Sequence, residues 1–464
     1  MNRWTGKDLL EAGYPQGPLF GKALEYANKT VNTVDELRKF AVRLDELNNP
    51  PKLQLQGARE LTINLEPSND LERENLVNVI ETMEVVMRTP TVTEGVIMPD
   101  ACPAGPLGTI PVGGIIATEG TIHPGMHSAD ICCSMMVTEF KDADPKVLLD
   151  AVNSVTHFGP GGRPDGQRFS LSQRLAKRMT LNPWLNSTKA MEMAVSHMGT
   201  QGDGNHFAFV GTNNAGNTCL VTHHGSRGPG AMLYKKGMAE AIKHTQKVAE
   251  GVLKQNSWLD FDSADGQSYW EALQTIRHWT KDNHSCLHTA AAQVANVKVL
   301  HRRWNEHNFV FQDGDTFFHA KGATPIHDQF LPDTDGVQIV PLNMAQPVLL
   351  IEGTRNSLNK GFAPHGAGRN ISRTKHKKSL GERSDEDVFA EETKGLDTRF
   401  YSGRIDVSEL PSAYKDGPAV RSQMESMGLA TVVDEIQPYG SIMAGDCEYD
   451  APWRKKRREK GRDL

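Results

Sequence analysis

The stretch Gly108-Thr109-Ile110-Pro111-Val112-Gly113-Gly114 sets a short apolar run between glycines and turn-forming residues. Two later stretches have the same texture: Cys219-Leu220-Val221-Thr222 and Pro347-Val348-Leu349-Leu350-Ile351. Short apolar runs bounded by turn signals are typical of buried strands. From about Val96 onward, the sequence therefore predicts short strands joined by glycine-rich loops.

Helical patterns interrupt these strands and dominate the first ninety residues. Apolar residues recur at helical spacing from Leu71 to Met87, and further helices are expected over 232–255 and 290–305. Residues 51–70 are expected to form a linker. The mixture predicts the α+β class, with a mainly helical N-terminal extension (1–90), a single large mixed α/β domain (91–446) and a basic C-terminal tail (447–464).

Composition excludes several classes of protein. Hydrophobic residues make up 38% of the 464 and charged residues 23%, which is ordinary for a globular chain. The sequence has no apolar run of about 18 residues or more, so no membrane span is expected, and the charged start predicts no secretory signal. Six cysteines in so long a chain predict reduced thiols in the cytoplasm. The net charge of −6 argues against a broad basic surface but allows a local basic groove.

One cluster of motifs carries metal-binding side chains. Asp130-Ile131-Cys132-Cys133 spaces a carboxylate and a thiol three residues apart, a mixed hard and soft pair that suits a transition metal. His206 follows a glycine turn, His223 follows an apolar strand, and His307 lies at an expected helix end. Most Asp-x-x-Cys pairs bind nothing, and a lone histidine is usually structural. The occurrence of Asp130, Cys133 and the three histidines together, in loop settings, favours a set of metal ligands.

A second motif, His365-Gly366-Ala367-Gly368-Arg369, has the chemistry of an anion cradle. Its glycines let the backbone approach a ligand closely and present N–H groups to it. Arg369 and the following Arg373 can bind phosphate with two hydrogen bonds each. His365 could itself attack phosphorus, and the alternative is a tight turn with a surface histidine.

Taken together, these motifs resemble the RtcB family of RNA ligases, in the family's order and over residues 90 to 446. The motifs that carry the resemblance are Met98-Pro99-Asp100, Asp130-x-x-Cys133, Gly204-Asn205-His206-Phe207, His223-x-Gly225-Ser226-Arg227-Gly228, His307-Asn308, Lys321-Gly322-Ala323, His365-Gly366-Ala367-Gly368-Arg369 and Ala413-Tyr414-Lys415.

The resemblance implies roles for these residues. Cys133 should bridge two Mn²⁺ ions, with Asp130 and His206 on one and His223 and His307 on the other. His365 should be the catalytic residue and accept GMP from GTP. The implied nucleotide contacts are Asn205, His307, Asn308, Glu352, Gly353, Thr354, His365, Gly366, Ala367, Gly368 and Tyr414, and the implied RNA or phosphate contacts are Arg227, Lys321, Arg369 and Arg373.

The implied reaction joins an RNA 3′-phosphate or 2′,3′-cyclic phosphate end to a 5′-hydroxyl end through a nucleotidyl-histidine. Its substrates would be cleaved tRNA or rRNA ends in tRNA splicing or RNA repair, and an activating protein is a further expected partner. Two rivals remain open: a dinuclear metal-dependent RNA phosphatase or cyclic phosphodiesterase, and a non-catalytic RNA-binding relative. The His365 loop argues against the first, and the complete ligand set argues against the second.

The sequence departs from the family pattern around these motifs. Cys132, Cys102 and His224 replace a usual glycine, histidine and serine without removing an expected ligand. In the expected nucleotide pocket, a usual glutamate is Phe209, a Pro-Gly-Ser loop is Glu352-Gly353-Thr354, and a guanine-contacting lysine is Ala444. Because two charged base contacts are absent, GTP is expected to remain usable while ATP competes with it.

The chain ends in a run of basic residues. It could contact RNA, or it could be a solvated terminus. The residues concerned are Arg454, Lys455, Lys456, Arg457, Arg458, Lys460 and Arg462.

Overall fold

The structure, a computed structural model, describes residues 4–17, 19–48, 52–57, 59–332, 334–447, 449 and 455. Contacts divide the chain into a small unit (Met1–Leu55 with His244–Val252) and a large unit (Gln56–Lys243 with Leu253–Leu464). Helices and several sheets are both present, so the expected α+β class is confirmed. The contacts group residues 56–90 with the large unit, whereas the sequence analysis placed them in the N-terminal extension. Nearly all of the basic tail lies outside the described residues.

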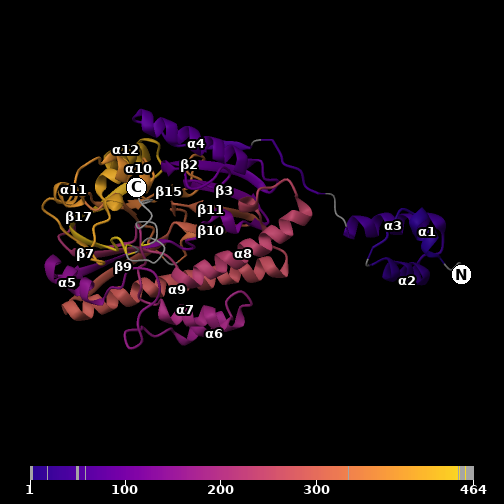
Figure 1. Ribbon diagram of the computed structural model, residues 1–464, viewed down its shortest axis with the longest axis horizontal. Helices are drawn as coiled ribbons and strands as arrows, with labels where there is room; N and C mark the ends of the chain where they lie inside the picture. The colour runs from indigo at the N-terminus through magenta and orange to yellow at the C-terminus, as the bar shows by residue number, and fades with distance from the viewer. Residues whose placement is uncertain are drawn as a thin grey trace. The chain divides into compact units, whose positions relative to one another are not determined.

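Figure 1 shows the chain coloured from its N-terminus to its C-terminus and labels many of its helices and strands. The helices are α1 (Gly6–Glu11), α2 (Phe20–Thr30), α3 (Val34–Asn48), α4 (Asp70–Met87), α5 (Pro145–Val155), α6 (Gln173–Leu181), α7 (Thr188–Ser196), α8 (Arg227–Val248), α9 (Ala264–Ala295), α10 (Arg373–Ser379), α11 (Asp385–Glu392) and α12 (Gly417–Ser426). The strands are β1 (Glu60–Ile63), β2 (Val92–Cys102), β3 (Val112–Glu119), β4 (Thr121–Ile122), β5 (Ser134–Lys141), β6 (Phe207–Asn213), β7 (Thr218–His224), β8 (Leu259–Asp260), β9 (Lys298–Glu306), β10 (Asn308–Asp313), β11 (Thr316–Lys321), β12 (Ala323–Pro325), β13 (Gln338–Pro341), β14 (Val348–Glu352), β15 (Phe362–Pro364), β16 (Asp397–Phe400) and β17 (Thr431–Met443).

The small unit is built from α1, α2 and α3. Thr5 begins α1 with a capping box, in which its side chain accepts from the Asp8 backbone and the Asp8 side chain accepts from the Thr5 backbone. The helices share a core that includes Leu9, Ala27 and Leu37. This unit therefore has its own hydrophobic core.

In the large unit, α4 covers a five-stranded sheet of order β1-β2-β3-β11-β10. The expected helix from Leu71 to Met87 is confirmed by α4, whose first turn is capped by the Asn69 side chain accepting from the Glu72 backbone. Its buried face includes Val79 and Met83 and packs with strand residues of β2 and β3. Apolar residues at helical spacing thus bury against the sheet.

The second sheet has eight strands, in the order β13-β14-β17-β6-β7-β5-β9, with β16 beside β17. Its register brings the motifs together. Ser134 of β5 pairs with His224 of β7 on one side and with Glu306 of β9 on the other. The neighbouring residues of these three positions, Cys133, His223 and His307, therefore lie at one end of adjacent strands.

The structure differs from the sequence expectations in two segments, 290–305 and 51–70. The helix expected over 290–305 is instead the end of α9, which stops where Asn296 takes a left-handed conformation (φ 52°, ψ 47°), followed by β9. His307 accordingly lies between two strands and not at a helix end. The linker expected over 51–70 contains β1, which pairs with β2 in parallel. The helix expected over 232–255 is confirmed by α8, which begins earlier, at Arg227, and ends at Val248.

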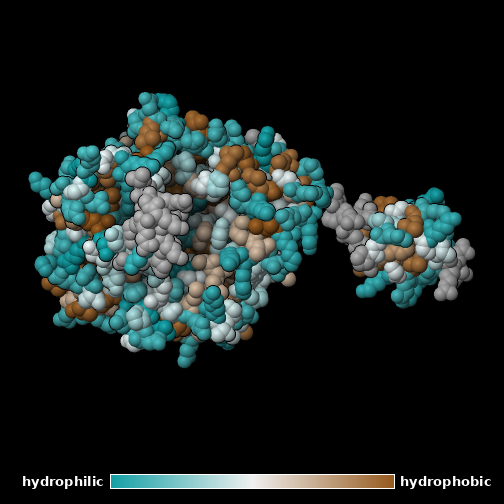
Figure 2. All heavy atoms as spheres, in the orientation of Figure 1, coloured by the Kyte–Doolittle hydropathy of each residue, from teal (hydrophilic) through white to brown (hydrophobic). Residues whose placement is uncertain are grey.

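Hydrophilic residues cover most of the visible face of the large unit, with small scattered hydrophobic patches (Figure 2). Within the described residues, no helix has both the length and the apolar character that a bilayer crossing requires.

Candidate active site

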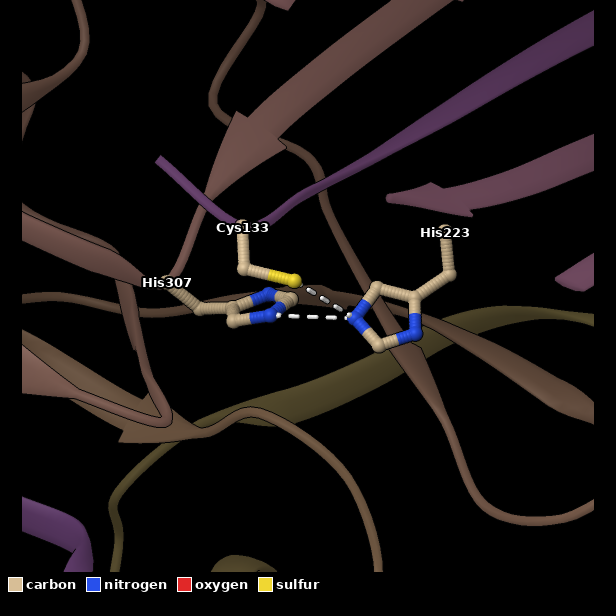
Figure 3. A group of neighbouring side chains, drawn as sticks. All are labelled: Cys133, His223 and His307. Carbon is tan, nitrogen blue, oxygen red and sulfur yellow. Dashed lines mark hydrogen bonds between the residues drawn. The ribbon is translucent and has the colours of Figure 1, made fainter. Parts of the chain in front are cut away.

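Cys133, His223 and His307 point their ligand atoms toward one another (Figure 3). The Cys133 Sγ lies 3.2 Å from the His223 Nε2, which lies 3.2 Å from the His307 Nε2. On its other side, the same thiol lies 3.6 Å from the His206 Nε2, and that nitrogen lies 3.3 Å from an Asp130 oxygen. Two groups of three potential metal ligands therefore share Cys133.

The chemistry of these side chains fits a metal centre. Burial lowers the pKa of His223 to about 3 and that of His307 well below its usual value, so both rings are neutral and keep a lone pair. Burial raises the pKa of the Cys133 thiol well above its usual range, a cost that a bound cation offsets. The His223 Nδ1 lies 3.1 Å from the Asn205 carbonyl, the usual way in which the second ring nitrogen of a metal ligand is held.

His365 lies beside this cluster, and a buried carboxylate fixes its orientation. The rings of His307 and His365 are 4.9 Å apart. Asp100, which is fully buried, accepts from the His365 Nδ1 at 2.5 Å and from the His365 backbone N–H at 3.1 Å. With its proton on Nδ1, the ring presents an Nε2 lone pair for nucleophilic attack.

The glycine loop packs tightly against the strand that carries Asp100. Gly368 has a φ of +72°, and a Cβ there would lie 2.0 Å from the Asp100 carbonyl oxygen. Only glycine satisfies both conditions. The loop therefore holds His365 and Asp100 at a fixed separation.

A buried glutamate organises the basic residues of the loop. Glu409 accepts from Arg369 at 2.7 Å, from Arg373 at 2.8 Å and from the Tyr414 hydroxyl at 2.6 Å. The Arg369 guanidinium also lies 4.8 Å from the centre of the Tyr414 ring. These contacts pre-position two cations and an aromatic ring beside His365.

A cavity of about 190 Å³ opens next to His365. Some of the expected nucleotide contacts line it: Asn205, His365, Gly366, Ala367, Gly368 and Tyr414. Two expected phosphate contacts line it as well, Arg369 and Arg373.

Other expected nucleotide contacts do not line this cavity. Glu352 is exposed at the end of β14, with Gly353 and Thr354 following it, and the loop from Pro341 to Met344 lines the cavity in their place. Asn308 is engaged by backbone groups, since its side chain accepts from Gly322 N–H at 2.7 Å. His307 belongs to the metal cluster, next to the cavity.

Two expected RNA contacts are bonded within the protein. Arg227 donates to the Gly159 carbonyl at 2.8 Å and to the Thr200 hydroxyl at 3.2 Å. Lys321 donates to the Ile110 carbonyl at 2.8 Å, and burial lowers its pKa to about 8.

The departures from the family pattern fall in different places. Phe209 and Cys102 line the cavity. Ala444 does not, because it packs in a separate apolar cluster. Cys132 has a φ of +58° and lies in the main core, outside both ligand groups. His224 stacks on His284 with 3.4 Å between ring centres.

Sequence reasoning missed three groups that shape the site. Asp100 was quoted within a motif but given no role, and its position in that motif was the available signal. Glu409 and Ser441 carried no local signal, because only the folded chain brings them to the cavity.

The fold and the site define an α+β protein with a centre able to hold metal ions, next to a glycine loop that carries a histidine oriented by Asp100. The chain belongs to the RtcB family: residues 167–444 match the family described as tRNA-splicing ligase RtcB.

Curated relatives carry related names. The chain is 26% identical over 412 residues to a tRNA-splicing ligase RtcB of Methanococcus maripaludis and 24% identical over 410 residues to one of Aeropyrum pernix. Each match covers 71% of this chain and 84% of the relative. The RNA-splicing ligase RtcB homolog 1 of Entamoeba histolytica is 24% identical over 298 residues, and there the match spans 55% of this chain and 56% of the relative.

Proposed function

We propose that this protein is an RNA ligase that joins a 3′-phosphate or 2′,3′-cyclic phosphate end to a 5′-hydroxyl end. The observation that carries the proposal is the placement of His365: its Nδ1 is held by Asp100, and its ring lies 4.9 Å from that of the metal-cluster residue His307. A phosphatase or a binding protein needs no oriented nucleophile in a glycine loop. The names of the relatives support the same activity.

Nucleotide transfer to His365 is the first step. The Nε2 lone pair forms a bond to the α-phosphorus of GTP, while the bond from that phosphorus to the bridging oxygen breaks and pyrophosphate leaves. Arg369 and Arg373 neutralise phosphate oxygens at the cavity. Asp100 keeps the proton on Nδ1 and stabilises the positive charge that develops on the ring.

RNA joining follows in two transfers. GMP passes from His365 to an oxygen of the RNA 3′-phosphate, which regenerates the free imidazole. The 5′-hydroxyl oxygen then attacks that phosphorus, forming the phosphodiester and releasing GMP. A 2′,3′-cyclic end is first opened to a 3′-phosphate.

Two Mn²⁺ ions would be held by Asp130, Cys133, His206, His223 and His307. When bound, they supply charge stabilisation for phosphoryl transfer and polarise the phosphate under attack. Cys133 must be a thiolate to bind metal, which suits a reducing compartment such as the cytoplasm. Substrates in this proposal are cleaved tRNA or rRNA ends, and an activating protein is a further candidate partner.

The test supplies the full chain with Mn²⁺, GTP and two RNA fragments. Joining is expected with 3′-phosphate and 5′-hydroxyl ends, together with an acid-labile, alkali-stable GMP adduct. His365→Ala should lose both, while His301→Ala, at an exposed position on β9, should keep them. Joining of 3′-hydroxyl to 5′-phosphate ends would contradict the polarity, and an adduct that survives in His365→Ala would move the nucleophile elsewhere.

The same assay separates the rival activities. Release of inorganic phosphate or opening of a cyclic phosphate with no joining and no adduct would favour the phosphatase or phosphodiesterase. RNA binding with no reaction would favour the non-catalytic relative.

A further inference from the structure

The hydroxyl of Ser441 is buried and has no hydrogen-bond partner among the described residues. Ser441 belongs to β17 and is 1% exposed. Buried polar groups in folded proteins are nearly always bonded, so an unpaired hydroxyl needs an explanation.

The strand geometry places the Ser441 side chain on the face of β17 that lines the cavity beside His365. Side chains alternate along a strand, and Ser441 and Met443 line the cavity, whereas Ile442 packs in the apolar cluster on the opposite face. Phe209, the register partner of Ser441 on β6, lines the cavity too. Directly paired residues share a face, so the two side chains stand together at the wall of the cavity.

The cavity has two chemically different ends. The His365 end carries Arg369 and Arg373, which suit phosphates. Around Ser441 the wall is apolar, formed by Phe207, Phe209, Leu342, Met344, Val348 and Met443. A cationic end and an apolar slot with one polar atom match a nucleotide whose phosphates lie at the arginines and whose base lies in the slot.

Two other polar side chains that line the cavity, those of Asn343 and Glu409, already have partners. Asn343 donates to Gln346 at 2.9 Å and accepts from the Ala345 backbone at 3.0 Å. Glu409 is held by two arginines and a tyrosine hydroxyl. Among the described residues that line the cavity, Ser441 alone has a buried side-chain oxygen without a partner.

We propose that Ser441 is a base-contacting residue that hydrogen-bonds the polar edge of a purine in this cavity. A hydroxyl both donates and accepts, so it can donate to the oxygen at position 6 of guanine or accept from the amino group of adenine. The cavity is then expected to bind both guanine and adenine nucleotides. Ser441 would take the place of the charged pair of residues that would select guanine. This inference rests on the proposed function.

Binding to the full chain tests the proposal without turnover. The ligands are the α,β-methylene analogues of GTP, 2′-deoxy-GTP and ATP, which cannot transfer their nucleotide, and tripolyphosphate, which lacks a base. Calorimetric titration in Mn²⁺ compares the wild type with Ser441→Ala. Loss of one neutral hydrogen bond predicts dissociation constants raised about three- to tenfold for all three nucleotides, and unchanged for tripolyphosphate.

Thr398→Ala is the matched control. Thr398 pairs with Ser441 across β16 and β17 and also has a buried, unpartnered hydroxyl, but it does not line the cavity. Its removal should leave every dissociation constant unchanged.

Four outcomes would overturn the inference. These are equal nucleotide affinity in Ser441→Ala and wild type, a loss confined to the ribose forms and absent with 2′-deoxy-GTP, an equal loss with tripolyphosphate, and the same loss in Thr398→Ala. Failure of the proposed function is distinct, because it would show as nucleotide binding with no adduct and no joining when hydrolysable GTP and RNA are supplied.

Discussion

Replacing Asp100 by asparagine should slow nucleotide transfer to His365 without weakening nucleotide binding. The carboxylate accepts from the His365 Nδ1 at 2.5 Å and from the His365 backbone at 3.1 Å, and it is fully buried. Asparagine keeps the volume but removes the charge that stabilises positive charge on the attacking ring. Asp100 is therefore a positioning residue, because it acts through His365.

The size of the effect follows from the bond that is lost. A hydrogen bond to a charged group contributes about 1.5–3 kcal/mol. At about 1.4 kcal/mol per factor of ten, the rate should fall roughly 10- to 150-fold. The assay is single-turnover formation of the His365 adduct by rapid quench, alongside calorimetric binding of α,β-methylene GTP.

Two results would refute this reasoning. One is an adduct rate within twofold of wild type. The other is a loss of rate matched by an equal loss of nucleotide affinity, since that would make Asp100 a structural support of the cavity. Asp313→Asn is the control, because Asp313 pairs with Arg355 outside the cavity.

Three further predictions concern metal, RNA and acid. Elemental analysis should show that Cys133→Ala loses both Mn²⁺ ions. Cys132→Ala should keep both, because Cys132 lies outside the ligand groups. Full Mn²⁺ occupancy in Cys133→Ala would show that Cys133 is not the shared ligand. The affinity for RNA should fall steeply as the salt concentration rises. Arg373→Gln should reduce the slope of the logarithm of the association constant against the logarithm of the salt concentration by about one. An unchanged slope would exclude a contact between Arg373 and an RNA phosphate. Burial lowers the pKa of His127 to about 4. As pH drops from about 6.5 to 4, the unfolded chain therefore binds a proton on His127 before the folded chain does, and the free energy of unfolding falls. Urea unfolding should show that this histidine accounts for a loss of about 2 kcal/mol at pH 5, which should be absent in His127→Gln.

The metal cluster could be predicted from the sequence because its residues are chemically distinctive. Cys133, His223 and His307 are ligand types that stand out in any chain. His223 follows an apolar run that predicts a strand, whereas His307 was expected at a helix end. Their convergence follows from the pairing of β5 with β7 and β9, which local pattern cannot supply. The resemblance to a family supplied that missing step.

The apolar end of the cavity could not be predicted in the same way. Ser441 and Phe209 look like ordinary strand residues, and their meeting depends on the register between β17 and β6. Glu409 is likewise one acidic residue among many until the fold brings Arg369 and Arg373 to it. Tertiary pairing, and not residue type, decides these contacts.

The position of Glu352 away from the cavity has a similar cause. Glu352 was assigned to the nucleotide site because Glu352-Gly353-Thr354 stands where the RtcB family has a Pro-Gly-Ser loop. The strands β13 and β14 are antiparallel, with Pro341 opposite Val348 and Gln338 opposite Ile351. Val348 lines the cavity beside Pro341, whereas Glu352 lies four residues further along β14, roughly 13 Å away at about 3.3 Å per residue. The end of β13 at Pro341 and the end of β14 at Glu352 therefore lie at opposite ends of the strand pair, and the Pro341 end is the one that adjoins the cavity.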